Sequence, residues 1–255
     1  MEFFLKKALN LFPRPWLIRM SYVARPFLVF FYKGNNFVDP IDGKSYRKLL
    51  GYGYENSRPN VLSPSTLSLE RHRLMWLYLK NETNFFTENL KVLHIAPEQA
   101  FLKRFRKMMN LDYITLDIES PIADIKADIR HLPLDDNAFD VIFCNHVLEH
   151  IEEDSLAMQE LYRVLKPGGW GIFQVPMKYN LATTYEDFSI TSPAERQKHF
   201  GQYDHVRWYG LDYFDRLREA GFEVDTSYTS ASFSDEERRK FALMPGEILP
   251  VVRKV

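Results

Sequence analysis

The segment Lys91-Val-Leu-His-Ile95 is a short apolar strand, and the stretch that it opens decides the fold. A tight turn, Ala96-Pro-Glu-Gln99, follows it, and a second apolar strand, Tyr113-Ile-Thr-Leu116, ends at Asp117. Between the strands a helix is predicted, because four apolar side chains recur on one helical face: Phe101, Phe105, Met108 and Met109. The order strand, helix, strand is typical of a parallel sheet.

Polar residues follow the next two predicted strands. Asp128 closes a third short apolar stretch, and a fourth strand, Phe139–Cys144, leads directly into Asn145 and His146. The carboxyl ends of parallel strands meet at one edge of a sheet, and ligands of such sheets bind there. We therefore expect these polar residues to gather beside Asp117.

The alternation of helix and strand continues to the end of the chain. A helix from about Asp154 ends at the stop signal Lys166-Pro-Gly-Gly169 and precedes the apolar strand Trp170–Val175. A further helix, Leu211–Ala220, and a strand, Gly221–Tyr228, follow an insertion. The whole pattern predicts an α/β fold.

Asp117 indicates a nucleoside ligand. It stands 19 residues after Glu98, close to the offset at which an acidic side chain accepts both ribose hydroxyls of an adenine nucleoside. A nicotinamide-dependent dehydrogenase would use the same aspartate, but it also needs a glycine-rich turn to hold pyrophosphate. The corresponding residues, His94–Ala100, contain no glycine, which disfavours a dehydrogenase.

Three segments in order carry a resemblance to a known family: Asp128–Asp140 (DIRHLPLDDNAFD), His146–His150 (HVLEH) and Leu161–Gly169 (LYRVLKPGG). Together they resemble class I S-adenosylmethionine (SAM)-dependent methyltransferases of the methyltransferase type 11 kind. The resemblance implies a doubly wound, Rossmann-like, mostly parallel seven-stranded sheet with an antiparallel last strand. It also implies an N-terminal appendage and SAM as the cofactor.

The resemblance assigns roles to residues at the sheet edge. It implies that Asp117 binds the ribose and that Asp128 binds the adenine amino group, with Ile129 beside the ring. Asn145 and His146 would hold the methionine end. The first turn would contribute three residues, of which the last accepts the amino group of SAM: His94, Ala96 and Glu98.

A subgroup of these methyltransferases carries a small zinc ribbon before the domain. In that subgroup two Cys-Pro-x-Cys knuckles precede a Ser-Leu-Glu-Arg-His-Arg helix, which this chain has at Ser68–Arg73, and the turn His-Ile-Ala-Pro-Glu, which it has at His94–Glu98. The four cysteine positions hold other residues here: Asp39, Asp42, Ser63 and Thr66. Neutral hydroxyls are poor zinc ligands, so we expect no structural zinc and assign no residue of the chain to a metal.

The resemblance divides the chain into an N-terminal appendage, residues 1–66, and a methyltransferase domain, residues 67–255. Residues 1–33 are basic and rich in aromatic side chains, but no apolar window there reaches the ~20 residues that span a bilayer. Such a segment could lie at a membrane interface, or pack on the domain or a partner subunit. We favour packing.

The insertion at about 177–208 is predicted to be the acceptor lid. It gathers tyrosine, acidic, arginine and histidine residues at the position where class I methyltransferases place the acceptor over the sulfonium. His205 and His146 are the candidate catalytic residues, since an imidazole can accept a proton near neutral pH. His146, Glu149 and His150 could form a base or metal site, or simply begin a helix with Glu149 as a first-turn anion.

Composition limits the partners. The net charge is −1 and the sequence pI about 6.7, so the chain lacks the basic excess of nucleic-acid binders. Its one cysteine, Cys144, falls in a predicted buried strand, so no intramolecular disulfide can form and we expect the protein in the reducing cytoplasm. Peripheral membrane contact through residues 1–33 is the alternative. We expect a small-molecule, sugar or lipid acceptor, and the sequence leaves the oligomeric state open. Fold does not settle function, so a non-catalytic scaffold remains the rival prediction.

Overall fold

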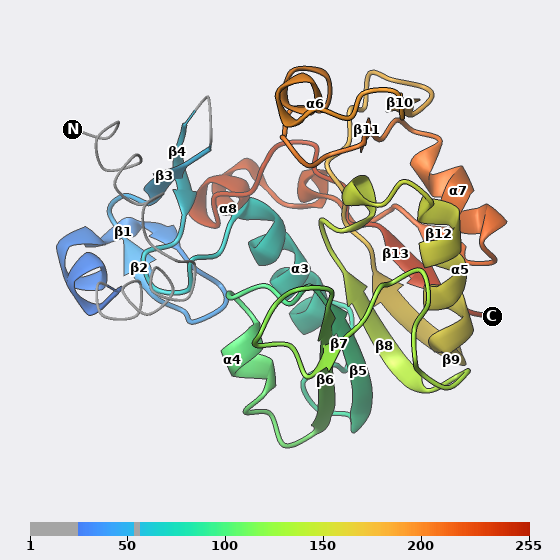
Figure 1. Ribbon diagram of the computed structural model, residues 1–255. Coiled ribbons are helices and arrows are strands. Elements are labelled where there is room, and N and C mark those ends of the chain that lie inside the picture. Colours follow the sequence, from blue (N-terminus) through green and yellow to red (C-terminus); the bar gives the residue numbers. More distant parts are fainter. Residues whose placement is uncertain (1–24, 54–56) are drawn as a thin grey trace. The chain divides into compact units, whose positions relative to one another are not determined.

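The computed structural model describes residues 25–53 and 57–255 (Figure 1). The chain divides into two compact units, residues 1–76 with 233–245 and residues 77–232 with 246–255. Within the first unit, Arg73 joins distant parts of the sequence, because its guanidinium donates to the carbonyls of Phe241 and Ala242 at 2.6 and 2.8 Å. The appendage therefore includes a late segment of the chain as well as the N-terminal region.

The second unit is built on a seven-stranded sheet with the order β12-β13-β9-β8-β5-β6-β7. Strands β5 to β9 pair in parallel, and β13 is antiparallel to both of its neighbours. The strand order reverses between β5 and β8, which makes this point the topological switch of a doubly wound sheet. The predicted fold class is confirmed, including the antiparallel last strand. The strands are β5 (Leu90–Ile95), β6 (Leu111–Asp117), β7 (Ile125–Lys126), β8 (Phe139–Cys144), β9 (Leu165–Ile172), β12 (Glu223–Asp225) and β13 (Val251–Arg253).

Apolar runs place the central strands inside the unit. Val141 to Cys144 on β8 are fully buried, as expected for a parallel strand that is covered on both faces. Helix α5 (Asp154–Val164) buries Ala157, Leu161 and Val164, which recur at helical spacing. Helix α7 (Tyr213–Glu219) lies beside it (Figure 1). The two helices thus cover one face of the sheet with apolar side chains.

Two element boundaries differ from the sequence predictions. Helix α4 is a single turn, Leu102–Phe105, and Met109 is almost fully exposed, because the chain must already enter β6 at Leu111. Strand β9 begins at Leu165, so the expected helix stop at 166–169 lies within the strand. The irregular register opposite Phe139 and Val141 accommodates these residues.

The remaining elements belong to the appendage, to the insertion and to short connections. They are β1 (Lys33–Val38), β2 (Ser45–Tyr46), β3 (Leu50–Tyr52), β4 (Arg58–Leu62), α3 (Glu70–Asn81), η1 (Leu148–His150), β10 (Tyr185–Glu186), α6 (Pro193–Phe200), β11 (Arg207–Trp208), η2 (Ser230–Ser232) and α8 (Asp235–Lys240). Strands β1 and β2 form one antiparallel pair, and β3 and β4 form another.

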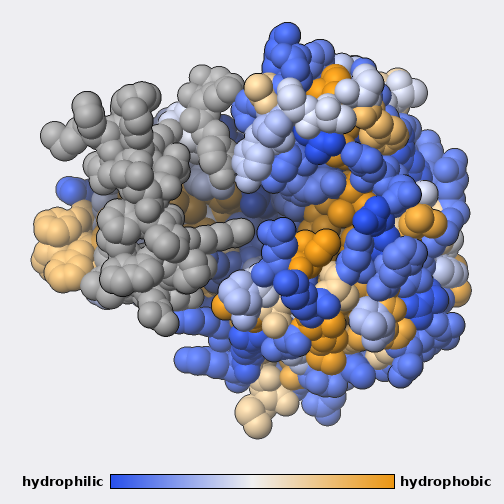
Figure 2. Space-filling view, viewed as in Figure 1, coloured by the Kyte–Doolittle hydropathy of each residue, from blue (hydrophilic) through white to orange (hydrophobic). Residues whose placement is uncertain are grey.

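Most of the basic and aromatic segment 1–33 lies outside the described residues. Residues 25–32 are helical and expose three phenylalanines, Phe27, Phe30 and Phe31. Figure 2 shows a light-orange, apolar patch at the left edge of the view, where this helix is drawn in Figure 1. Among the residues that the structure describes, no helix combines the length and the hydropathy needed to cross a bilayer.

Hydrogen bonds join two of the four positions where the ribbon subgroup has cysteines. Asp39 is buried, and its Oδ2 accepts from the hydroxyls of Thr66 (2.5 Å) and Ser68 (3.2 Å), while Oδ1 accepts from the backbone N–H of Ile41 (3.0 Å). Asp42 lies apart from them and pairs with Lys44. A carboxylate with three donors therefore holds the end of β1 to the segment that follows β4.

Replacing Asp39 by alanine should destabilise the first unit. The substitution orphans two buried hydroxyls and one buried N–H, and each unsatisfied group costs ~1–3 kcal/mol. Hydrogen–deuterium exchange of residues 57–76 should therefore accelerate, while Asp42→Ala should change it little. The zinc content of the Asp39→Ala protein should equal that of the wild type. A fall in bound zinc would show that Asp39 is a metal ligand.

Candidate active site

Three strands of the sheet end level with one another. Ile95 on β5 pairs with Leu116 on β6 and with Cys144 on β8, so the turns after these strands lie side by side. Two non-glycine residues at this edge have positive φ, Ala96 (46°) and His146 (55°). The left-handed region is costly for such residues and is concentrated at functional sites. The first turn therefore reverses direction without glycine.

His94 and Glu98 form a hydrogen-bonded chain that ends at Tyr113. His94 is fully buried; its Nδ1 lies 2.7 Å from the Tyr113 hydroxyl and its Nε2 lies 2.6 Å from Oε2 of Glu98. Burial raises the pKa of Tyr113, which keeps its proton and donates it to Nδ1. Nε2–H then donates to the Glu98 carboxylate. His94 thus orients Glu98, and its own side chain is fully buried.

Asp117 is held by one oxygen and open at the other. Oδ1 accepts from the backbone N–H groups of Glu119 (2.8 Å) and Ser120 (2.7 Å), which fix the carboxylate at the end of β6. None of the hydrogen bonds among the described residues involves Oδ2. An acceptor that is fixed in place and has an open lone pair suits a sugar hydroxyl.

Asp128 is paired with Arg130. The arginine donates from its backbone N and Nε to Oδ1 and from Nε and Nη2 to Oδ2, at 2.7 to 3.1 Å. These hydrogen bonds lower the pKa of Asp128. They also occupy the carboxylate, so the expected contact with an adenine amino group requires Arg130 to move. Ile129 is buried in the core of the second unit.

Asn145 and His146 are hydrogen-bonded to Gln174, two residues after the end of β9. Oδ1 of Asn145 accepts from the backbone N–H of Gln174 (3.1 Å), and the N–H of His146 donates to the carbonyl of Gln174 (2.7 Å). The His146 side chain remains 30% exposed, and its Nδ1 lies 3.2 Å from Oε1 of Glu149. His146 is therefore the predicted histidine with the greater access from the edge.

Glu149 is the centre of a cluster of histidines. It is 1% exposed and lies near His146, His150 and His205, and the rings of His150 and His205 are 4.8 Å apart and nearly perpendicular. Burial alone would raise the pKa of Glu149, but the histidines lower it overall. Burial lowers the pKa of His205. The sequence pointed to Glu149 through the HVLEH segment but gave no sign that His205 lies against it.

A buried ion network fixes the insertion that carries His205. Arg207 is 1% exposed; its Nε donates to Glu186 (2.7 Å), and its Nη atoms donate to the carbonyls of Ile151 (2.5 Å) and Glu152 (2.8 Å). The N–H of Val206 donates to the carbonyl of Glu149 at 2.9 Å. These contacts hold β11 against η1. None of these partners was predicted from the sequence.

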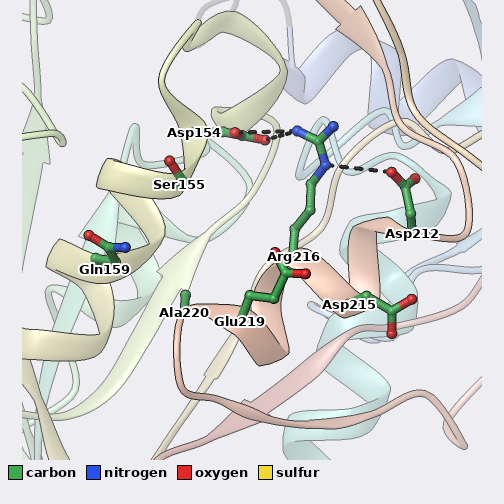
Figure 3. Close-up of a pocket in the computed structure, with 8 residues that line it drawn as sticks. All are labelled: Asp154, Ser155, Gln159, Asp212, Asp215, Arg216, Glu219 and Ala220. Atoms are coloured by element: carbon green, nitrogen blue, oxygen red, sulfur yellow. Dashed lines mark hydrogen bonds and ion pairs between the residues drawn. The ribbon is translucent and has the colours of Figure 1, made fainter.

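A polar pocket between α5 and α7 contains none of the predicted site residues. Arg216 is its central cation and pairs with Asp154 (3.1 Å) and Asp212 (3.6 Å) (Figure 3). The volume is about 540 Å³, and the lining is Asp154, Ser155, Gln159, Asp212, Asp215, Arg216, Glu219 and Ala220. We treat this pocket as part of the ion network and place the site at the sheet edge.

Residues 79–173 match the family model Methyltransf_11, described as a methyltransferase domain. The matched segment is less than half of the chain. It includes β5, β6, β7, β8 and α5, and therefore the sheet edge described above. The match supports the predicted class I SAM-dependent methyltransferase over this segment, and the zinc-ribbon subgroup remains a prediction.

Curated relatives match short parts of this chain. The ubiquinone/menaquinone biosynthesis C-methyltransferase UbiE of Idiomarina loihiensis is 37% identical over 69 residues, 26% of this chain and 28% of the relative. The 2-phytyl-1,4-naphtoquinone methyltransferase of Nostoc punctiforme is 45% identical over 47 residues, 18% of this chain and 20% of the relative. The chain thus spans less than a third of the length of these two relatives.

Two solved structures are similar to this chain at low sequence identity. An S-adenosylmethionine-dependent methyltransferase from Mesorhizobium loti has a TM-score of 0.47 and 15% identity, and the match covers 71% of this chain and 98% of that one. A 1,6-didemethyltoxoflavin-N1-methyltransferase from Burkholderia thailandensis has a TM-score of 0.47 and 13% identity, with 71% and 76% covered.

Proposed function

We propose that the chain transfers a methyl group from SAM to a small-molecule acceptor, and that a quinol ring is the leading acceptor. The observation that carries the proposal is the domain match over residues 79–173, whose strand ends present an open carboxylate oxygen at Asp117. The names of the curated relatives, which include quinone C-methyltransferases, favour a quinol over a sugar or another lipid.

The residues at the edge fit the polar groups of SAM. Oδ2 of Asp117 is placed to accept from the ribose hydroxyls, and Glu98, oriented by His94, is placed to accept from the amino group. Asp128 fits less directly, because Arg130 occupies it. The second partner of Arg130 is the exposed Glu153, so the guanidinium can turn outward when an adenine amino group takes its place.

When bound, SAM supplies a methyl group on a positively charged sulfonium sulfur. The protein's contribution is then mainly alignment, which can be worth ~7–11 kcal/mol in such displacements. We assign to His146 a hydrogen bond to the acceptor, because its side chain is partly exposed and its ring is held by Glu149. His205 is buried in the cluster that it forms with Glu149 and His150. It would therefore act on the acceptor through these residues and not by direct contact.

Calorimetry with SAM and S-adenosylhomocysteine tests the first half of the proposal, and both should bind. The second half is tested by incubating the full chain with methyl-labelled SAM and a panel of quinols, hydroxylated lipids and sugars, followed by mass spectrometry. Label should appear on a quinol and be lost in Asp117→Asn. Binding of neither nucleoside would favour a scaffold, and label on a sugar alone would rule out the quinol.

A further inference from the structure

Glu149, His150 and His205 converge although they come from two distant segments. One ligand atom of each residue, an oxygen of Glu149 and a ring nitrogen of each histidine, lies within 4.8 Å of the other two. Glu149 is 1% exposed and His205 is 6% exposed, while the side chain of His150 is 29% exposed. This is the one group of three or more such side chains with this spacing among the residues that the structure describes.

The cluster is held in place by its surroundings. His150 ends η1, and His205 stands two residues before Arg207, whose buried guanidinium binds the carbonyls of Ile151 and Glu152. The backbone hydrogen bond from Val206 to Glu149 joins the two segments directly. Rigid support of this kind is what a metal site needs from its second shell of contacts.

Hydrogen bonds also leave one ring nitrogen of each histidine available. Nδ1 of His150 lies 3.2 Å from the carbonyl of Asp204, so Nδ1 carries the proton and Nε2 has a lone pair. Nδ1 of His205 is buried without a hydrogen-bond partner, and the backbone of Phe200 interacts with the imidazole. Metal-binding histidines are typically oriented by a backbone carbonyl in this way.

We propose that Glu149, His150 and His205 bind one divalent transition-metal ion of the Zn²⁺ class. Two imidazoles and one carboxylate suit zinc, cobalt or nickel better than magnesium or calcium, which prefer oxygen ligands. Glu149 is a buried carboxylate that Nδ1 of His146 approaches at 3.2 Å, and a buried carboxylate needs a compensating cation. The sequence brings Glu149 and His150 together in one candidate base or metal segment, but nothing in it places His205 beside them.

The three ligand atoms must move closer together to bind one ion. A tetrahedral zinc with bonds of ~2.0–2.2 Å separates its ligand atoms by ~3.3–3.6 Å, so ligand atoms that lie up to 4.8 Å apart must approach by up to about 1.2–1.5 Å. Rotation of the partly exposed His150 ring can supply this movement. Three protein ligands leave a fourth position for water or for an acceptor oxygen, as in catalytic zinc sites. The site itself does not depend on SAM binding.

The test is metal binding by the full chain after chelator treatment and dialysis against Zn²⁺ or Co²⁺. Elemental analysis should give about one ion per chain, and the ion should raise Tm, because it binds the folded state. Glu149→Gln keeps the side-chain volume and His150→Asn changes a partly exposed residue, so both should fold. Each should weaken metal affinity by at least ~100-fold. Mutating residues that only hydrogen-bond to metal ligands already lowers metal affinity by ~10–100-fold.

Matched controls are His131→Asn, which changes an exposed histidine outside the cluster, and Asp39→Ala in the first unit. Both should bind the ion as the wild type does. The proposal is overturned if the wild type binds no Zn²⁺ or Co²⁺, or if Glu149→Gln and His150→Asn bind as tightly as the wild type. Protonated histidines would then be the cations that compensate Glu149. Calorimetry with SAM on the same samples tests the proposed function separately.

Discussion

Replacing Asp117 by asparagine should weaken SAM binding by tenfold or more while leaving the fold intact. The amide keeps an oxygen that can accept from the N–H groups of Glu119 and Ser120, as Oδ1 does now. Its nitrogen cannot accept from a ribose hydroxyl. Hydrogen bonds to a charged partner contribute ~1.5–3 kcal/mol each, and 1.4 kcal/mol corresponds to about tenfold in affinity. Isothermal calorimetry measures the change.

Two further variants decide whether the loss belongs to the ribose contact. Asp112→Asn removes an exposed carboxylate from the start of the same strand and should leave SAM affinity unchanged. Asp128→Ala should lower SAM affinity less than Asp117→Asn does. Arg130 already occupies the Asp128 carboxylate, and losing Asp128 removes only the contact with the adenine amino group. Unchanged affinity in folded Asp117→Asn would show that the ribose is bound elsewhere.

The sheet and its edge could be predicted because the signals are local. Phe139–Cys144 is a continuous apolar run, as a parallel strand buried on both faces requires, and the predicted strand matches β8 at both ends. Helix α5 shows apolar residues at helical spacing and begins where predicted. Since parallel strands end at one edge, the order of the strands along the chain was enough to place Asp117 and Asn145 together.

The parts of the site that could not be predicted depend on contacts between distant segments. Glu149 and His205 are 56 residues apart, and neither periodicity nor turn chemistry relates them. His94 was predicted among the cofactor-binding residues, and its ring is buried against Tyr113; Leu93 and Ile95 are buried as well, so alternation along β5 could not predict this contact. The return of residues 233–245 to the first unit likewise depends on the hydrogen bonds of Arg73.

Arg207 should be among the residues most important for the stability of the second unit. The Arg207 side chain is 1% exposed. Its guanidinium pairs with Glu186 and Asp154 and donates to carbonyls at the end of η1. Methionine would leave two carboxylates without this cation, although Arg216 still reaches both. Breaking a buried pair in this way costs ~3–5 kcal/mol.

The expected Arg207→Met protein therefore has a Tm lowered by roughly 6–20 °C, from ~2–4 °C per kcal/mol in a domain of this size. Arg218→Met is the matched control, because Arg218 is half exposed and pairs with the exposed Asp215. Such surface pairs contribute only ~0–1 kcal/mol. If Arg207→Met lowers Tm as little as the control does, Arg216 alone compensates both carboxylates.

Hydrogen exchange separates two ways in which Arg207→Met can lose stability. If the network stabilises the whole second unit, exchange should accelerate in the central strand β8 as well as in the insertion. If it only fastens the insertion, faster exchange should be confined to β10, α6 and β11. We expect the first result, because Arg207 binds the carbonyls of Leu148 and Ile151 on the segment that continues β8 and leads into α5. Acceleration confined to the insertion would show that this segment opens independently of the sheet.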